Sequence, residues 1–134
     1  MLRLIPAFAA ATMAFSAQAQ DFTGGDAEAG ERVFRRCAAC HAVGEDAQNR
    51  VGPQLNQLFG RVPGSMEGFA YSSAMQEFGE THVWDAETLA SFVQAPRDVV
   101  SGTKMAFPGL RKEQDVADLL AYLAQSDDEG FTVE

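Results

Sequence analysis

Apolar residues recur at helical spacing in three stretches of the chain, and these stretches predict its main helices. In the first stretch, Ala29, Val33 and Cys37 follow one another at intervals of four residues and so share one helical face. Asp26 is suited to cap this helix, and Glu28 places a negative charge in the first turn, where the helix dipole favours it. We therefore expect a helix that begins near Asp26 and carries Cys37 at its end.

The second and third stretches predict two further helices in the C-terminal half. Asp85 can cap a helix that runs to about Ala95, because Pro96 cannot continue it. The last helix is expected over 114–125. The apolar stripes of these two helices consist of Leu89, Phe92 and Val93, and of Val116, Leu119, Leu120 and Leu123.

Loops are predicted between the helices. Glycine and proline recur too often over 42–63 for long regular elements, and 97–110 also has the composition of a loop. A short helix is expected over 71–78, and the acidic residues 126–134 are expected to form a tail. The pattern contains no internal repeat and no second domain, so it predicts one all-α domain with three main helices, short helices and long loops.

Residues 1–19 have the composition of a secretory signal peptide. Arg3 supplies a short positive region, residues 4–15 are mostly apolar but too few to span a bilayer, and Ala17-Gln18-Ala19 fits a small-residue cleavage site. We therefore expect cleavage after Ala19 and a periplasmic mature domain over 20–134. Without Arg3, the ten basic residues become nine against nineteen acidic ones, a net charge of −10 that disfavours non-specific nucleic-acid binding.

The segment Cys37-Ala38-Ala39-Cys40-His41 is the strongest chemical signal in the chain. Its C-x-x-C-H spacing is that of covalent haem attachment, in which each sulfur adds to one vinyl group and the histidine ligates the iron. A thioredoxin-like site would need a strand–helix–strand pattern, which the sequence lacks, and a zinc site would need a fourth ligand besides the remote His82. A plain disulfide would leave His41 without a role.

A six-coordinate haem iron needs a second axial ligand opposite His41. After removal of the signal peptide, the candidates are His82, Met66, Met75 and Met105. Met105 lies in a predicted loop between two helices, from which it can reach the opposite haem face. We therefore expect Met105 to be the second ligand.

Several motifs make the chain resemble the soluble class I cytochromes c, the family of mitochondrial cytochrome c and its bacterial periplasmic relatives. Residues 102–105, followed by Phe107, resemble the methionine loop of that family. The resemblance extends over 25–123 and implies the small cytochrome c fold around one covalently attached haem c. It rests further on Val51-Gly52-Pro53, Leu58-Phe59-Gly60-Arg61, Gly68-Phe69-Ala70-Tyr71, Trp84 and Asp118-Leu119-Leu120-Ala121-Tyr122-Leu123.

The resemblance also implies roles for individual residues. His41 and Met105 would be the axial ligands, Cys37 and Cys40 would hold the haem covalently, and the carbonyl of Pro53 would accept the ring proton of His41. The other residues that the resemblance assigns to haem binding are Arg61, Tyr71 and Trp84 at the propionates, and Thr103 and Phe107 in the methionine loop.

Packing between the first and last helices is also implied, with Gly30 and Phe34 against Leu119 and Tyr122. Three positions depart from the family pattern. Phe92 stands where a tyrosine often reaches the methionine sulfur, Ser101 replaces a proline, and Met75 replaces an asparagine.

The function implied by the resemblance is that of a soluble one-electron carrier and not of an enzyme. It would be a monomer that carries electrons from a quinol–cytochrome c reductase to an oxidase, a photosynthetic reaction centre or a periplasmic reductase, and would meet membranes only through such complexes. A haem enzyme or gas sensor with an open sixth position is the alternative, and a permanent subunit of a larger redox complex is a third. Redox partners would dock at the haem edge through Arg36, Arg50, Arg97, Lys104, Arg111 and Lys112.

Overall fold

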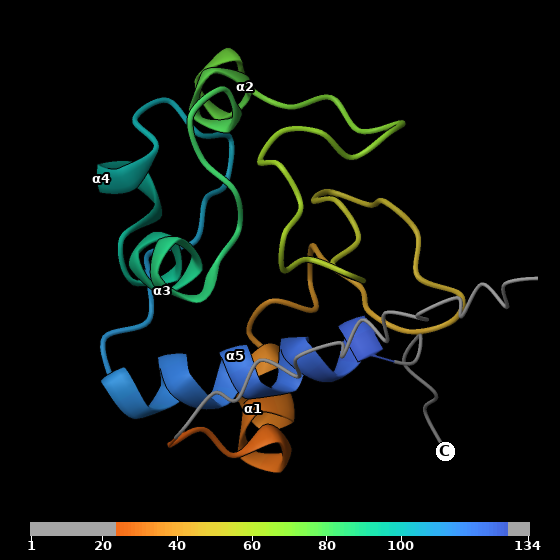
Figure 1. Ribbon diagram of the computed structural model, residues 1–134, viewed down its shortest axis with the longest axis vertical. Coiled ribbons are helices and arrows are strands. Elements are labelled where there is room, and N and C mark those ends of the chain that lie inside the picture. The colour runs from red at the N-terminus through yellow and green to blue at the C-terminus, as the bar shows by residue number, and fades with distance from the viewer. Residues whose placement is uncertain (1–23, 129–134) are drawn as a thin grey trace, which may run out of the picture.

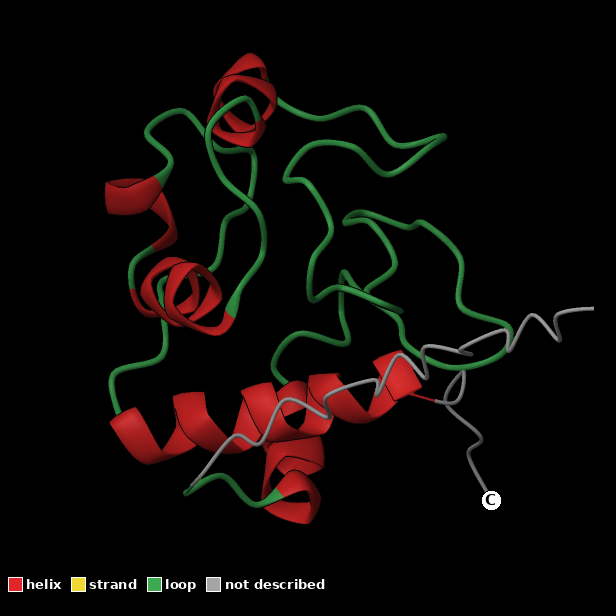
Figure 2. Ribbon diagram, viewed as in Figure 1, coloured by secondary structure: helices red, strands yellow, loops and turns green. Residues whose placement is uncertain are grey.

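Helices joined by long loops make up residues 24–128, the part of the chain that the computed structural model describes (Figure 1). No strand occurs within these residues, which confirms the predicted all-α class. Figure 2 shows the helices along two sides of the molecule and loops over the rest. The elements are α1 (Ala27–Phe34), α2 (Ser73–Gly79), α3 (Ala86–Gln94), α4 (Pro96–Val99) and α5 (Glu113–Asp128).

Side-chain caps fix where three of these helices begin. Asp26 accepts a hydrogen bond from the backbone N–H of Ala29 at 3.0 Å, and Asp85 accepts one from Thr88 at 2.7 Å, so both predicted caps are confirmed. Ser72 caps α2 in the same way, through the N–H of Met75. Each cap satisfies one of the N–H groups that the first turn of a helix leaves without a partner.

The first and last helices cross in close contact (Figure 1). A Cβ atom at Gly30 would clash with the carbonyl oxygen of Asp118 and would lie 2.7 Å from the Cβ of Tyr122, so only glycine permits this approach. The rings of Phe34 and Tyr122 lie 5.4 Å apart between centroids, and Leu119 is almost fully buried. The predicted contact between the two helices is therefore confirmed.

Asp118 fastens the segment before α1 to α5. Its carboxylate is buried and accepts hydrogen bonds from the Asp26 N–H and from Gln114 Nε2, both at 2.8 Å. Gln114 Nε2 also donates to the carbonyl of Gly24 at 2.8 Å. Hydrogen bonds compensate the burial of this polar group.

Helix boundaries differ from the prediction at several places. α2, expected over 71–78, runs from Ser73 to Gly79. α1 ends at Phe34, and Cys37 lies in a series of turns that follows it. Residues 97–110 were expected to be a loop, but they include most of α4, because proline is favoured at the first position of a helix as well as after its end. α5 continues to Asp128 and includes the beginning of the predicted tail.

The predicted signal peptide and the rest of the tail lie outside the described residues. Within residues 24–128, no helix is both long enough and apolar enough to cross a membrane.

Candidate haem site

A cavity of about 400 Å³ lies between the helices and the loops, and its walls are mainly apolar. Its volume is within the range of about 300–1,000 Å³ that is typical of ligand and cofactor pockets. α3 contributes Leu89, Phe92 and Val93, and α5 contributes Leu119 and Leu123. All the predicted site residues lie on the walls, namely Cys37, Cys40, His41, Pro53, Arg61, Tyr71, Trp84, Thr103, Met105 and Phe107.

The two cysteines lie in a hydrogen-bonded turn directly after α1. The N–H groups of Cys40 and His41 both donate to the carbonyl of Cys37, at 3.1 and 2.9 Å. Both thiols are free and half-buried at the cavity wall. Burial raises the pKa of Cys37 to about 11, against the opposing effect of the Arg36 charge, so its thiol is protonated at neutral pH.

The ring of His41 is held by the segment Gly52-Pro53. Its Nδ1 lies 2.7 Å from the carbonyl oxygen of Pro53, and because a carbonyl can only accept, Nδ1 must carry the proton. Gly52 is packed against the same ring, where a Cβ atom would clash with it. Burial lowers the pKa of His41, although the bond to Pro53 opposes the shift, and the neutral ring therefore presents Nε2 as a free electron pair.

The methionine loop, which belongs to the C-terminal half of the chain, also forms part of the cavity wall. Its backbone is ordered by two bonds, in which the N–H of Met105 donates to Thr103 Oγ1 at 3.2 Å and the N–H of Thr103 donates to the carbonyl of Val100 at 3.0 Å. Gly102 has a φ of +93° and lies against Ala74 of α2. The loop therefore holds a half-buried thioether at the wall of the cavity that contains His41.

The three residues assigned to the propionates lie on the cavity wall near one another in the loop region. Arg61 Nη1 donates to the carbonyl of Gln54 at 2.8 Å, and Nη2 donates to the carbonyl of Asn56. The Tyr71 hydroxyl accepts the N–H of Met66 at 3.1 Å, and burial raises its pKa. Trp84 is buried, with its ring 5.1 Å from that of Phe92.

Two departures from the family pattern are also part of the cavity wall. Met75 and Phe92 are both buried there, so the positions that often carry an amide and a phenol hydroxyl carry a thioether and a phenyl ring. The third, Ser101, is exposed and lies outside the wall.

Of the predicted docking residues, Arg36 and Lys104 lie at the cavity itself. The Arg36 guanidinium is 5.6 Å from the centre of the Phe107 ring and 4.0 Å from the carboxylate of Asp115. Lys104 Nζ donates to the carbonyl of Ala70 at 3.2 Å. The remaining members of the set, Arg50, Arg97, Arg111 and Lys112, are exposed.

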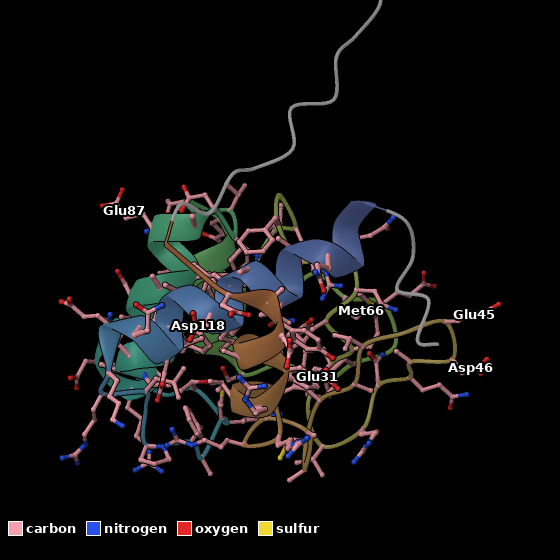
Figure 3. The ribbon with its side chains drawn as sticks, turned by 90° about the horizontal axis from the view of Figure 1, so that it is seen from below. Glu31, Glu45, Asp46, Met66, Glu87 and Asp118 are labelled. Carbon is pink, nitrogen blue, oxygen red and sulfur yellow. The ribbon has the colours of Figure 1, made fainter. Side chains whose placement is uncertain are left out.

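Some acidic side chains lie far from the cavity. Figure 3 shows Glu45 and Asp46 at one end of the molecule, on the outer part of a loop, and Glu87 at the other end on α3. None of these three side chains contributes to the cavity wall.

The donor set and the shape of the cavity fit a covalently attached haem. A large apolar cavity brings together two free thiols, a neutral imidazole and a thioether sulfur, and Arg61 and Tyr71 add polar groups to its wall. Sequence reasoning did not assign Gly64 and Ser72 to this wall. Their only signal was that they lie in or beside glycine-rich loop segments.

Comparisons with known proteins agree with this description. The family model for cytochrome c matches residues 27–127. Cytochrome c2 of Blastochloris viridis is 47% identical over 105 residues, which cover 78% of this chain and 81% of that protein. Cytochrome c2 of Afifella marina is 50% identical over 104 residues, 77% of this chain and 84% of that protein.

A solved structure extends the agreement to three dimensions. Cytochrome c2 from Rhodospirillum centenum superposes with a TM-score of 0.74 at 36% identity, over 77% of this chain and 99% of that one. The fold is thus the small class I cytochrome c fold. The chain belongs to the cytochrome c family, which implies one covalently attached haem c.

Proposed function

We propose that this protein is an exported one-electron carrier with histidine–methionine ligation of its haem iron. The observation that carries the proposal is the convergence of His41, Met105, Cys37 and Cys40 on one apolar cavity. The relatives named cytochrome c2 support the role of electron carrier. When bound, the haem supplies a one-electron iron couple.

The residues of this chain would adapt that couple to electron transfer. Cys37 and Cys40 would fix the haem covalently, and Pro53 would hold His41 in the orientation and tautomer that ligation requires. Met105 would occupy the remaining axial position, and as a neutral soft ligand it would favour ferrous iron and raise the reduction potential. With His41 and Met105 both holding the iron, small molecules would have no open site on it.

The polar residues near the cavity would serve the propionates and the methionine loop. Arg61, Tyr71 and Trp84 would provide donors that compensate the burial of propionate charge. Thr103 would keep the methionine loop ordered through its contact with the N–H of Met105, and Phe107 would close the cavity beside it.

Cellular location and partners follow from the sequence and charge pattern. The signal peptide, cleaved after Ala19, would direct residues 20–134 to the periplasm, where a monomer would shuttle between a quinol–cytochrome c reductase and a terminal acceptor. A basic area at the haem edge would attract acidic partners despite the negative net charge of the chain. That area consists of Arg36, Arg50, Arg97, Lys104, Arg111 and Lys112.

Spectroscopy of the purified holoprotein tests the ligation. The pyridine haemochrome should have the signature of saturated vinyl groups, and the ferric protein should have the weak near-infrared sulfur-to-iron band. Met105→Ala should abolish that band and lower the potential, whereas Met66→Ala should change neither, because Met66 is not part of the cavity wall. An unchanged Met105→Ala spectrum would mean that another residue is the ligand.

The alternative of a haem enzyme or gas sensor is tested by the same sample. A high-spin spectrum that responds to carbon monoxide at neutral pH would favour an open sixth position. No contact of the described residues favours that alternative over the electron carrier.

A further inference from the structure

The haem-attachment segment is bonded along its length to the loop that follows it. The Gly52 N–H donates to the carbonyl of Cys40 at 2.9 Å, and the Leu55 N–H donates to the carbonyl of Ala42 at 2.9 Å. Between these two bonds lies the contact of His41 Nδ1 with the Pro53 carbonyl. Successive residues of 40–42 thus pair with residues of 52–55 in register.

The side-chain amide of Asn56 continues this series of bonds by pairing with both backbone groups of Gly44. Its Oδ1 accepts the N–H of Gly44 at 2.9 Å, and its Nδ2 donates to the carbonyl of the same residue at 2.7 Å. Gly44 is buried and has a φ of +118°, so the chain reverses there in a conformation that glycine favours. The side-chain amide of Asn56 therefore satisfies both the N–H and the carbonyl of Gly44.

The backbone of Asn56 is also fully engaged. Its N–H donates to Gln54 Oε1 at 2.7 Å, and its carbonyl accepts from the guanidinium of Arg61. All four hydrogen-bonding groups of Asn56 therefore have partners. Gly44 lies beyond the haem-attachment segment, whereas Gln54 and Arg61 lie on either side of Asn56 along the chain.

We propose that Asn56 is a positioning residue for His41, which it serves by fixing the Pro53 carbonyl against the imidazole ring. The Pro53 carbonyl belongs to the same peptide group as the Gln54 N–H, which donates to Asn49 Oδ1 at 3.0 Å. Beyond that bond, the place of the carbonyl depends on the neighbouring residues, with Gly52 bonded on one side and Leu55 and Asn56 bonded on the other. The inference rests on the proposed role of His41 as an iron ligand.

The place of the Pro53 carbonyl affects the basicity of the His41 ring, the proposed iron ligand. Donation from Nδ1 to a carbonyl makes the imidazole more basic, and a more basic ligand favours ferric iron. If the Pro53 carbonyl is less firmly held, the ring is less basic, and the reduction potential rises. Asn56 therefore keeps the potential lower than the same ligands would have with a loose Pro53.

The variant Asn56→Ala tests this inference in the folded holoprotein. We expect a higher reduction potential than in the wild type and altered NMR shifts of the His41 ring protons. We also expect solvent exchange of the His41 ring N–H to be faster by roughly ten- to a hundredfold, since each lost neutral hydrogen bond removes on the order of tenfold protection. This acceleration should exceed that of the Leu119 and Leu120 amides in α5, which report the opening of the whole fold.

Two further variants complete the experiment. Gln48→Ala removes an exposed amide from the same loop and should leave potential, ring shifts and ring exchange at wild-type values. Asn56→Ser keeps a neutral polar side chain that is too short to bond both groups of Gly44, and it should shift all three readouts in the direction of Asn56→Ala. It also provides the test if the alanine variant fails to fold.

An Asn56→Ala or Asn56→Ser protein with wild-type potential and wild-type His41 ring shifts would overturn the inference. The same result follows if ring exchange accelerates only as much as exchange of the α5 amides. A wild-type spectrum without histidine–methionine ligation would instead refute the proposed function, and that outcome is read before any variant is made.

Discussion

Replacing Gly30 by alanine sets two physical effects of opposite sign against each other. In an isolated helix the change stabilises, by about 0.5–1 kcal/mol, because glycine loses more backbone entropy on folding. In this protein the added Cβ would clash with the Asp118 carbonyl oxygen and would lie 2.6 Å from its carbon and 2.7 Å from the Cβ of Tyr122. Unstrained carbon contacts are about 3.5–4.0 Å.

The expected loss of stability can be estimated from the amount by which these distances fall short of an unstrained contact. α1 would have to move away from α5 by about 1 Å, which separates Phe34 from Tyr122 and opens the helix crossing. Overpacking of this kind costs about 1–3 kcal/mol, and the steric cost falls on backbone atoms that cannot rotate away. After the propensity gain is subtracted, we expect the free energy of unfolding to fall by about 1–2 kcal/mol, or Tm by roughly 5–10 °C.

The assay is reversible unfolding of the holoprotein by heat and by guanidinium chloride, followed by far-ultraviolet circular dichroism. Glu31→Ala and Glu31→Gly form the matched control, because Glu31 is the exposed neighbour on α1 (Figure 3) and the difference between the two measures propensity alone. A Gly30→Ala protein as stable as the wild type, or more stable, would show that the crossing tolerates a Cβ and that the steric argument is wrong.

Three further predictions concern charge, hydrogen bonding and docking. Hydrogen bonds from Thr88 lower the pKa of Asp85, so ionised Asp85 stabilises the fold at pH values above the ordinary aspartate pKa of about 4, and this stabilisation is lost as the pH falls through the lowered pKa. The difference in Tm between wild type and Asp85→Asn should therefore be present at neutral pH and vanish in acid. A Tm difference that persists unchanged in acid would contradict this prediction. Tyr71→Phe leaves a backbone N–H without its acceptor and should reduce the unfolding free energy by about 1 kcal/mol in denaturant titrations, with an unchanged midpoint as the contrary result. Arg36→Glu with Lys104→Glu should slow electron transfer to an acidic partner and flatten its salt dependence in stopped-flow experiments, and wild-type rates at all salt concentrations would exclude the docking area.

The parts of the fold that local sequence determines could be predicted. Asp26 and Asp85 act within one helical turn of themselves, so their capping roles are visible in the sequence. The apolar stripe of α5 ends with Leu123, and the predicted helix ended soon after it, whereas the actual helix continues to Asp128. Apolar periodicity records where a helix is packed and not where its backbone stops.

Other features depend on contacts between distant segments. Pro96 was expected only to stop a helix, and nothing nearby indicated that the chain would use it to begin α4. The Asn56 amide bonds to Gly44 across a loop, and asparagine in a loop ordinarily suggests only a turn. In the candidate site, the C-x-x-C-H spacing predicted the chemistry of 37–41, whereas the Pro53 carbonyl that orients its histidine was expected only from the family resemblance, because spacing alone does not place residues 52–53 beside His41.

The crossing of α1 and α5 has a consequence for the order of assembly. The polypeptide is synthesised from its N-terminus, so the attachment cysteines exist while the helix that covers Gly30 and Phe34 has not yet been made. Until α5 arrives, the wall formed by Leu119 and Leu123 is missing and the thiols border an incomplete cavity. The topology thus makes the last helix the element that completes the cavity around the two thiols.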